Sequence, residues 1–134
     1  MSGDLARRQA DLVAALTSGA PVPPGFDAHL VGVARTALLR KRAGEVARAW
    51  PMLAASLGSE WQATFAAWAA TRPTNGSFRD GFDLARSLRP LTGEAARELA
   101  EREAAWHYDG ESPPTRRSRA ATTARTWLLR LRSR

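Results

Sequence analysis

The sequence contains no cysteine, one tyrosine and two histidines in 134 residues. Without cysteine the chain has no disulfide bond, no thiolate metal site and no cysteine nucleophile, which excludes disulfide scaffolds, zinc fingers and cysteine enzymes. The longest apolar stretches are far shorter than the roughly 20 residues of a membrane span. No apolar signal-peptide centre follows Met1, and Arg7-Arg8 precedes Asp11 instead of the apolar region of a twin-arginine signal. We therefore expect a cytoplasmic protein that does not enter a membrane.

Isoleucine is absent and valine is scarce, whereas the chain has 27 alanines and 15 leucines. Abundant alanine and leucine favour helices, and the lack of β-branched aliphatic residues argues against a large sheet. A chain of this length fits one domain and buries roughly two-thirds of its unfolded surface. We predict an all-α fold, with one compact domain of about five or six helices and a C-terminal basic arm.

Acidic residues are absent from the last part of the chain. Residues 1–111 carry 13 basic and 13 acidic side chains, whereas residues 112–134 carry seven arginines and no acid. The formal net charge of +7 therefore belongs to the tail, and a function that needs positive charge must be assigned to the tail alone. We divide the chain into a helical domain at 1–111 and an Arg-rich arm at 112–134.

Helical spacing and capping residues divide the domain into six segments. They predict helices at about residues 4–16, 27–50, 52–57, 59–71, 80–88 and 92–107. Trp50, Trp61, Phe65 and Trp68 are interpreted as core, with a partner-binding groove as the alternative. In the last helix, glutamates interleave with arginines, which predicts a solvated face of salt bridges formed by Glu94, Arg97, Glu98, Glu101, Arg102 and Glu103.

Catalytic motifs are missing. The sequence has no glycine-rich phosphate loop, no G-x-S-x-G and no HExxH. His107, Asp109 and Glu111 could offer three metal ligands on an extended stretch, but such triplets at a helix end are common by chance. His29 lies in a first helical turn, where a solvated or capping role is the simpler interpretation. We predict that the chain is not an enzyme and holds no metal or cofactor.

The tail is the candidate binding site, and residues 126–132 have two interpretations. As a strand, Trp127, Leu129 and Leu131 share one side; as a helix, Trp127, Leu128 and Leu131 group together. We favour a strand or extended arm, because such a segment can add a strand to a partner sheet. The predicted partner- or peptide-binding residues are Arg116, Arg117, Arg119, Arg125, Trp127, Leu129, Arg130, Leu131 and Arg132.

An ordered set of motifs across about residues 5–108 resembles a known family. It consists of Arg35, Trp50-Pro51-Met52-Leu53, Leu57-Gly58, Trp61, Phe65, Arg72-Pro73, Ser77-Phe78, Gly81-Phe82 and Leu84-Ala85. This set is similar to the helical N-terminal domain of HvfC/BufC-type proteins, in its short actinobacterial form, which is found alone or fused behind an oxidase. Ala34 stands where that family often has Tyr, and Trp61 where Phe is usual. The larger C-terminal domain of the long members is replaced here by the basic tail.

The resemblance implies an accessory role in the biosynthesis of ribosomally made, modified peptides. Proteins of that family are partners of multinuclear non-haem iron oxidases, which alter Cys or Asp side chains of a precursor peptide at iron centres of their own. The resemblance therefore implies two partners, the oxidase and the precursor peptide, with the iron held by the oxidase.

Two other functions remain open at the level of sequence. An older label of the same family describes DNA binding, and the seven tail arginines could neutralise phosphates of DNA or RNA, with a salt slope of log K of at most about −6. The balanced charge of residues 1–111 and the lack of a basic recognition helix speak against this alternative. Membrane-surface attachment through Trp127, Leu128 and Leu131 would rest on a small apolar face.

Overall fold

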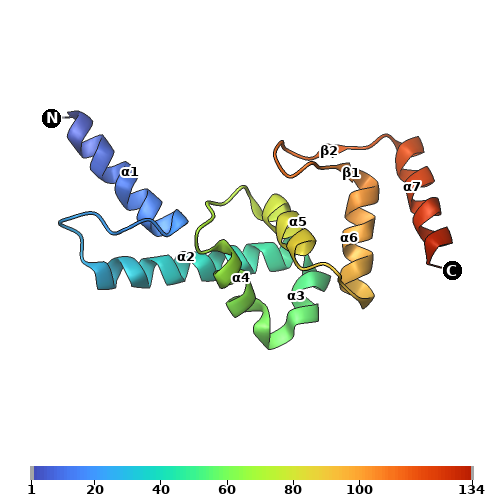
Figure 1. Cartoon of the computed structure of the whole chain (residues 1–134), viewed down its shortest axis with the longest axis horizontal. Coiled ribbons are helices and arrows are strands. Elements are labelled where there is room, and N and C mark those ends of the chain that lie inside the picture. Colours follow the sequence, from blue (N-terminus) through green and yellow to red (C-terminus); the bar gives the residue numbers. More distant parts are fainter. Residues whose placement is uncertain (1, 134) are drawn as a thin grey trace.

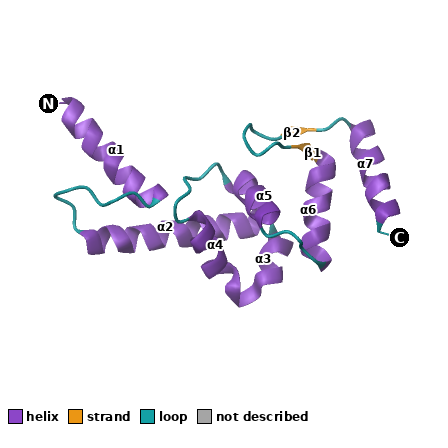
Figure 2. Ribbon diagram, viewed as in Figure 1, coloured by secondary structure: helices purple, strands orange, loops and turns teal. Residues whose placement is uncertain are grey.

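The second helix is the longest element; the first, third, fourth and fifth helices contact it, whereas the sixth and seventh lie beyond its C-terminal end (Figure 1). A computed structural model describes residues 2–133, without the side chains of residues 2 and 119–123. Within residues 2–133 there are seven α-helices, one 3-10 turn and two short strands (Figure 2). The helices are α1 (Ser2–Ser18), α2 (Ala28–Ala49), α3 (Pro51–Leu57), α4 (Trp61–Ala69), α5 (Ser77–Ser87), α6 (Gly93–Ala105) and α7 (Arg119–Arg132). The 3-10 turn is η1 (Gly58–Glu60), and the strands are β1 (Trp106–His107) and β2 (Thr115–Arg116). The predicted all-α fold is confirmed.

Helix α2 begins and ends where the sequence predicts. The Asp27 carboxylate caps it by accepting hydrogen bonds from the backbone N–H groups of His29 (2.8 Å) and Leu30 (3.3 Å). Arg35 extends from α2 to the end of α1, where its side chain donates to the carbonyls of Ala15 (2.9 Å) and Ala20 (3.3 Å). Helix α1 therefore lies along the first half of α2, while α3, α4 and α5 pack on the second half (Figure 1).

The hydrophobic core lies where α2 to α6 meet. Its largest fully buried side chains are Trp50, Phe65, Phe82, Leu53, Leu84 and Val46. The indole N–H of Trp50 donates to the Phe78 carbonyl (3.0 Å), and that of Trp61 donates to the Ala43 carbonyl (3.1 Å). Two large aromatic side chains thus fill the space that alanine-rich helices leave open without burying an unpaired polar group. The interpretation of Trp50, Trp61 and Phe65 as core is confirmed, and Trp68 packs against that core while remaining partly exposed.

The predicted solvated face of α6 is wrong at Glu98. This side chain is buried, and its two carboxylate oxygens accept hydrogen bonds from the N–H groups of Met52 and Leu53, each at 2.9 Å. These amides lie in the first turn of α3, where helical N–H groups have no partner inside the helix and a negative charge is favourable. The Glu94–Arg97 ion pair, at 3.3 Å, is exposed as expected, and Glu101 is exposed as well. Glu98 therefore holds α6 against α3.

The tail folds back on the domain, and its helix replaces the strand that we favoured. Strands β1 and β2 pair antiparallel, with Trp106 opposite Arg116, and α7 then runs back along α6 (Figure 1). The preference for a strand at residues 126–132 is wrong: the segment belongs to α7, a helix that pairs its own backbone groups without a neighbouring strand and contacts α6. Extended structure in the tail is confined to the two residues of β2.

Tyr108 follows β1 and predicts a loss of stability at alkaline pH. Its hydroxyl donates to Asp83 Oδ1 (2.8 Å), and burial raises the pKa of the phenol, an effect that Arg79 opposes and Asp83 reinforces. The folded chain thus keeps this proton at pH values where the unfolded chain, with a pKa of about 10, releases it. The contribution to stability is complete below pH about 10 and disappears as pH rises through the higher folded pKa.

The stability advantage of the wild type over Tyr108→Phe should therefore shrink as pH rises above about 10. Urea unfolding at a series of pH values measures it, and tyrosinate absorbance reports the pKa directly because Tyr108 is the single tyrosine. A difference in unfolding free energy that stays constant with pH would contradict the assignment.

Candidate partner-binding surfaces

Helix α7 presents an uncovered apolar strip. Trp127, Leu128 and Leu131 are 62%, 54% and 48% exposed, although they are among the most apolar side chains of the tail. At 3.6 residues per turn, these three positions fall on one side of the helix. We call this strip, together with Arg125, Arg130 and Arg132 beside it, the α7 face.

The opposite side of α7 is turned towards α6. Thr126, Leu129 and Ser133 on that side, and Arg130 at the edge between that side and the α7 face, line a groove of about 590 Å³ between the two helices. On the α6 side the groove is lined by Ala96, Ala100 and Ala104, which recur at every fourth residue, and by the charged residues Arg97 and Glu101. Leu129 therefore lies on the other side of α7 from Trp127 and Leu131, and the prediction that these three side chains share a face is wrong.

The predicted arginines divide into two groups. The guanidinium of Arg116 lies over the ring of Trp106, at 5.2 Å from its centroid, and the side chain of Arg117 donates to the Glu103 carbonyl (3.3 Å). Both therefore attach the tail to α6 and β1. Arg125, Arg130 and Arg132 are exposed, and within the described residues no carboxylate forms an ion pair with them. The side chain of Arg119 lies outside the described residues.

A second group of exposed apolar side chains lies at the other end of the molecule. Leu5 and Val13 of α1 are 59% and 55% exposed, and Leu30 and Val33 of α2 are 64% and 55% exposed. We call these four residues the α1–α2 end. Sequence analysis did not identify these four side chains as exposed. The proline-rich connector at 19–27 was the available signal, because it lengthens the turn between two helices that meet only in part (Figure 1).

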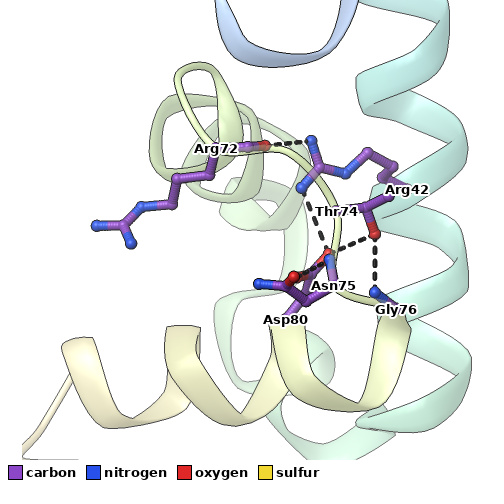
Figure 3. Close-up of polar contacts among 6 residues, drawn as sticks. All are labelled: Arg42, Arg72, Thr74, Asn75, Gly76 and Asp80. Atoms are coloured by element: carbon purple, nitrogen blue, oxygen red, sulfur yellow. Dashed lines mark hydrogen bonds and ion pairs between the residues drawn. The ribbon is translucent and has the colours of Figure 1, made fainter. Parts of the chain in front are cut away.

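A polar cluster anchors the loop between α4 and α5 (Figure 3). The buried carboxylate of Asp80 accepts from the Thr74 hydroxyl (3.0 Å) and the Asn75 N–H (3.1 Å), and it pairs with Arg42 at 3.4 Å. Arg42 also donates to the Arg72 carbonyl at 2.8 Å. The sequence predicts a helix that begins at Asp80, whereas α5 begins at Ser77 and Asp80 lies inside its first turn. Because each carboxylate oxygen already has a partner within the chain, the cluster serves the fold and not a ligand.

Of the candidate metal ligands of the hairpin, the Asp109 side chain has structural partners. The carboxylate of Asp109 accepts hydrogen bonds from the N–H groups of Glu111 and Ser112, each at 2.8 Å, and these bonds lower its pKa. Across the described part of the chain, no three His, Asp or Glu side chains are grouped so that they could hold a metal ion. Among the described helices, none is long and apolar enough to cross a membrane.

Comparisons with known proteins cover most of the chain. Residues 6–90, which include α1 to α5 except the first residues of α1, match the family model described as "SCO6045-like, C-terminal domain". A UPF0276 protein of Streptomyces avermitilis is 40% identical over 135 aligned positions, which cover 94% of this chain and 27% of that protein. The chain thus spans about a quarter of the length of this relative. No solved structure matches. The match over residues 6–90 shows that the chain belongs to the SCO6045-like C-terminal domain family.

Proposed function

We propose that this chain is a non-catalytic partner subunit of a multinuclear non-haem iron oxidase, and that it helps to recognise or present a ribosomally synthesised precursor peptide. The observation that carries the proposal is the presence of two uncovered apolar surfaces, the α1–α2 end and the α7 face, at opposite ends of the molecule (Figure 1). Two separate surfaces suit a protein that contacts two partners at once. The motif resemblance to HvfC/BufC-type proteins supplies the identity of those partners.

The UPF0276 relative supports a role beside a larger protein. In that relative the segment similar to this chain makes up 27% of one polypeptide, so it is covalently joined to a much larger remainder. Two parts of one polypeptide are held at a high effective concentration, so a stable contact between them is favoured. We propose that the same contact, made between separate chains, is the function of the α1–α2 end here.

The chemistry of the α1–α2 end suits a lasting contact. Its four side chains are leucine and valine, and lasting interfaces are more apolar than transient ones. The α7 face is apolar as well but has three arginines beside it, which suits a partner that is attracted by charge and released again. The iron belongs to the oxidase in this proposal, because a chain with two histidines and no cysteine is poor in ligands for several irons.

Nucleic-acid binding is the alternative function, and Arg125, Arg130 and Arg132 favour it because they are exposed in a segment without acid. The centre of the same face consists of Trp127, Leu128 and Leu131, which contribute nothing to phosphate contacts. We therefore rank it second to the partner-subunit function.

Co-expression with a multinuclear non-haem iron oxidase of the same genome tests the proposal. We expect the two chains to co-elute in size-exclusion chromatography with mass determination at both about 150 mM and about 500 mM salt, because an apolar interface is little screened by salt. Two folded proteins that elute separately at both concentrations would refute the proposed partnership.

The double variant Leu30→Gln with Val33→Gln should weaken the complex with the oxidase by at least about tenfold, since buried apolar side chains at the centre of an interface carry most of the binding energy. Ala63→Gln, at an exposed position of α4, is the matched control and should bind like the wild type. Affinities from biolayer interferometry check both variants. Equal affinity of all three proteins would place the interface elsewhere.

A further inference from the structure

The α7 face has a specific arrangement of apolar and charged side chains. Taken at 100° per residue around the helix, Trp127, Leu128 and Leu131 form a strip about 100° wide. Arg125 and Arg132 lie beyond the Leu128 edge of the strip, two turns apart, and Arg130 lies beyond the Trp127 edge. The strip therefore has positive charge on both sides and, from residue 112 to residue 134, no acidic residue near it in the sequence.

We propose that the α7 face binds an acidic amphipathic helix of the precursor peptide, one whose apolar stripe is flanked on both sides by aspartate or glutamate. The proposal deepens the proposed function, on which it rests for the source of the helix. The bound segment lays its apolar stripe on Trp127, Leu128 and Leu131 and pairs its carboxylates with the arginines on either side.

The arginines of the α7 face indicate that the bound segment carries negative charge. Arg125, Arg130 and Arg132 have no carboxylate partner in the described structure, so a negatively charged ligand gains ion pairs without breaking existing ones. Bidentate contacts to carboxylates are a geometry that arginine favours. A neutral or basic helix would leave three arginines desolvated at the edges of the contact, which is costly.

The apolar strip favours a polypeptide over a lipid surface as the bound partner. Trp127 is 62% exposed within the apolar strip, and tryptophan is enriched at the hot spots of polypeptide interfaces. Three apolar side chains make a small face for insertion into lipid, whose anchoring helices usually carry a longer apolar stripe. Because the other side of α7 is held on α6 across the groove, the strip is presented on a preformed helix, and little ordering is needed on binding.

The test uses the full-length chain and a labelled synthetic peptide of about four helical turns, with leucine on one face and glutamate on both flanks. Fluorescence anisotropy should show binding that weakens as salt rises from about 50 mM to about 300 mM, because ion pairs contribute to it. A version of the peptide with lysine in place of glutamate should bind at least about tenfold more weakly. Equal binding of the two peptides would overturn the proposal.

Matched variants separate the α7 face from the rest of the surface. Leu128→Ala and Leu5→Ala each shorten a leucine that is more than half exposed, at 54% and 59% respectively. Leu128→Ala should weaken the affinity for the acidic peptide at least about fivefold, whereas Leu5→Ala should leave this affinity unchanged. Arg125→Gln should reduce both affinity and salt dependence, whereas Arg48→Gln, at an exposed position of α2, should change neither. Losses of the same size in both members of a pair would overturn the assignment to α7.

Three further measurements test the occupant. Binding is also measured to vesicles of phosphatidylserine with phosphatidylcholine and to a DNA duplex of about 20 base pairs. The proposal would be overturned if the chain bound either of them more tightly than the acidic peptide and the Leu128→Ala variant lost that binding. Saturating oxidase should leave peptide affinity unchanged, and competition between the two would assign the α7 face to the oxidase instead. Because the peptide assay needs only this chain, its failure is distinguishable from a failure to bind the oxidase.

Discussion

Replacing Gly81 with alanine is expected to lower the free energy of unfolding by about 3 kcal/mol, the upper end of what overpacking of a core usually costs. A Cβ atom at this position would lie 2.6 Å from Cγ of Trp50 and closer still to Cδ1 and Nε1 of the same ring. The ring cannot move aside freely, because it is fully buried and its N–H donates to the Phe78 carbonyl at 3.0 Å. Urea unfolding followed by circular dichroism measures the change.

Gly44→Ala is the matched control for Gly81→Ala. Gly44 also lies inside a helix, α2, but a Cβ atom there would have no atom within 4 Å. Alanine has a higher helix propensity than glycine, so this variant should be more stable than the wild type by about 0.5–1 kcal/mol. Opposite signs for the two substitutions would confirm that Gly81 is required for contact with Trp50. Stabilisation by both would refute it.

Replacing Asp80 with alanine is expected to lower the free energy of unfolding by about 3–5 kcal/mol, because it leaves a largely buried arginine without its carboxylate. The Arg42 side chain is 12% exposed, so water can replace the lost contact only in part. The same substitution removes the acceptor of the Thr74 hydroxyl and the Asn75 N–H (Figure 3). Equilibrium unfolding measures the loss, and faster proteolysis within residues 72–76 should accompany it.

Glu94→Ala provides the comparison for Asp80→Ala. The Glu94–Arg97 pair has nearly the same length, 3.3 Å against 3.4 Å for Arg42–Asp80, but both of its side chains are more than 60% exposed. Exposed pairs one helical turn apart contribute about 0.5 kcal/mol or less. Similar losses in the two variants would show that burial of the Arg42–Asp80 pair does not determine its contribution.

The ends of α2 and α3 followed from local sequence signals. Asp27 caps α2, Pro51 lies in the first turn of α3, and Gly58 adopts a positive φ of 52° after α3. These features depend on neighbouring residues only. The role of Glu98 could not be predicted, because its partners, Met52 and Leu53, lie more than 40 positions away in the sequence. In the sequence, Glu98 stands among arginines, as a surface residue does. Its role appears only in the fold, where the first turn of α3 lies next to it.

The candidate site was predicted in part. Sequence analysis selected Trp127, Leu131 and the arginines beside them, since apolar side chains in an acid-free segment stand out. It could not decide between strand and helix, because both conformations group apolar residues and only the neighbouring element distinguishes them. Nor could it find Leu30 and Val33: helical spacing shows that residues share a face, but not whether another helix covers that face.

Helix α2 is also a spacer. Its 22 residues span about 33 Å at 1.5 Å per residue, and it joins the α1–α2 end to the core on which α6 and α7 are mounted (Figure 1). It runs between its ends without an internal proline, so the two surfaces are held at a set separation and do not depend on a flexible linker. In the proposed function, the length of α2 therefore sets how far a partner docked at the α1–α2 end lies from the core that carries the α7 face.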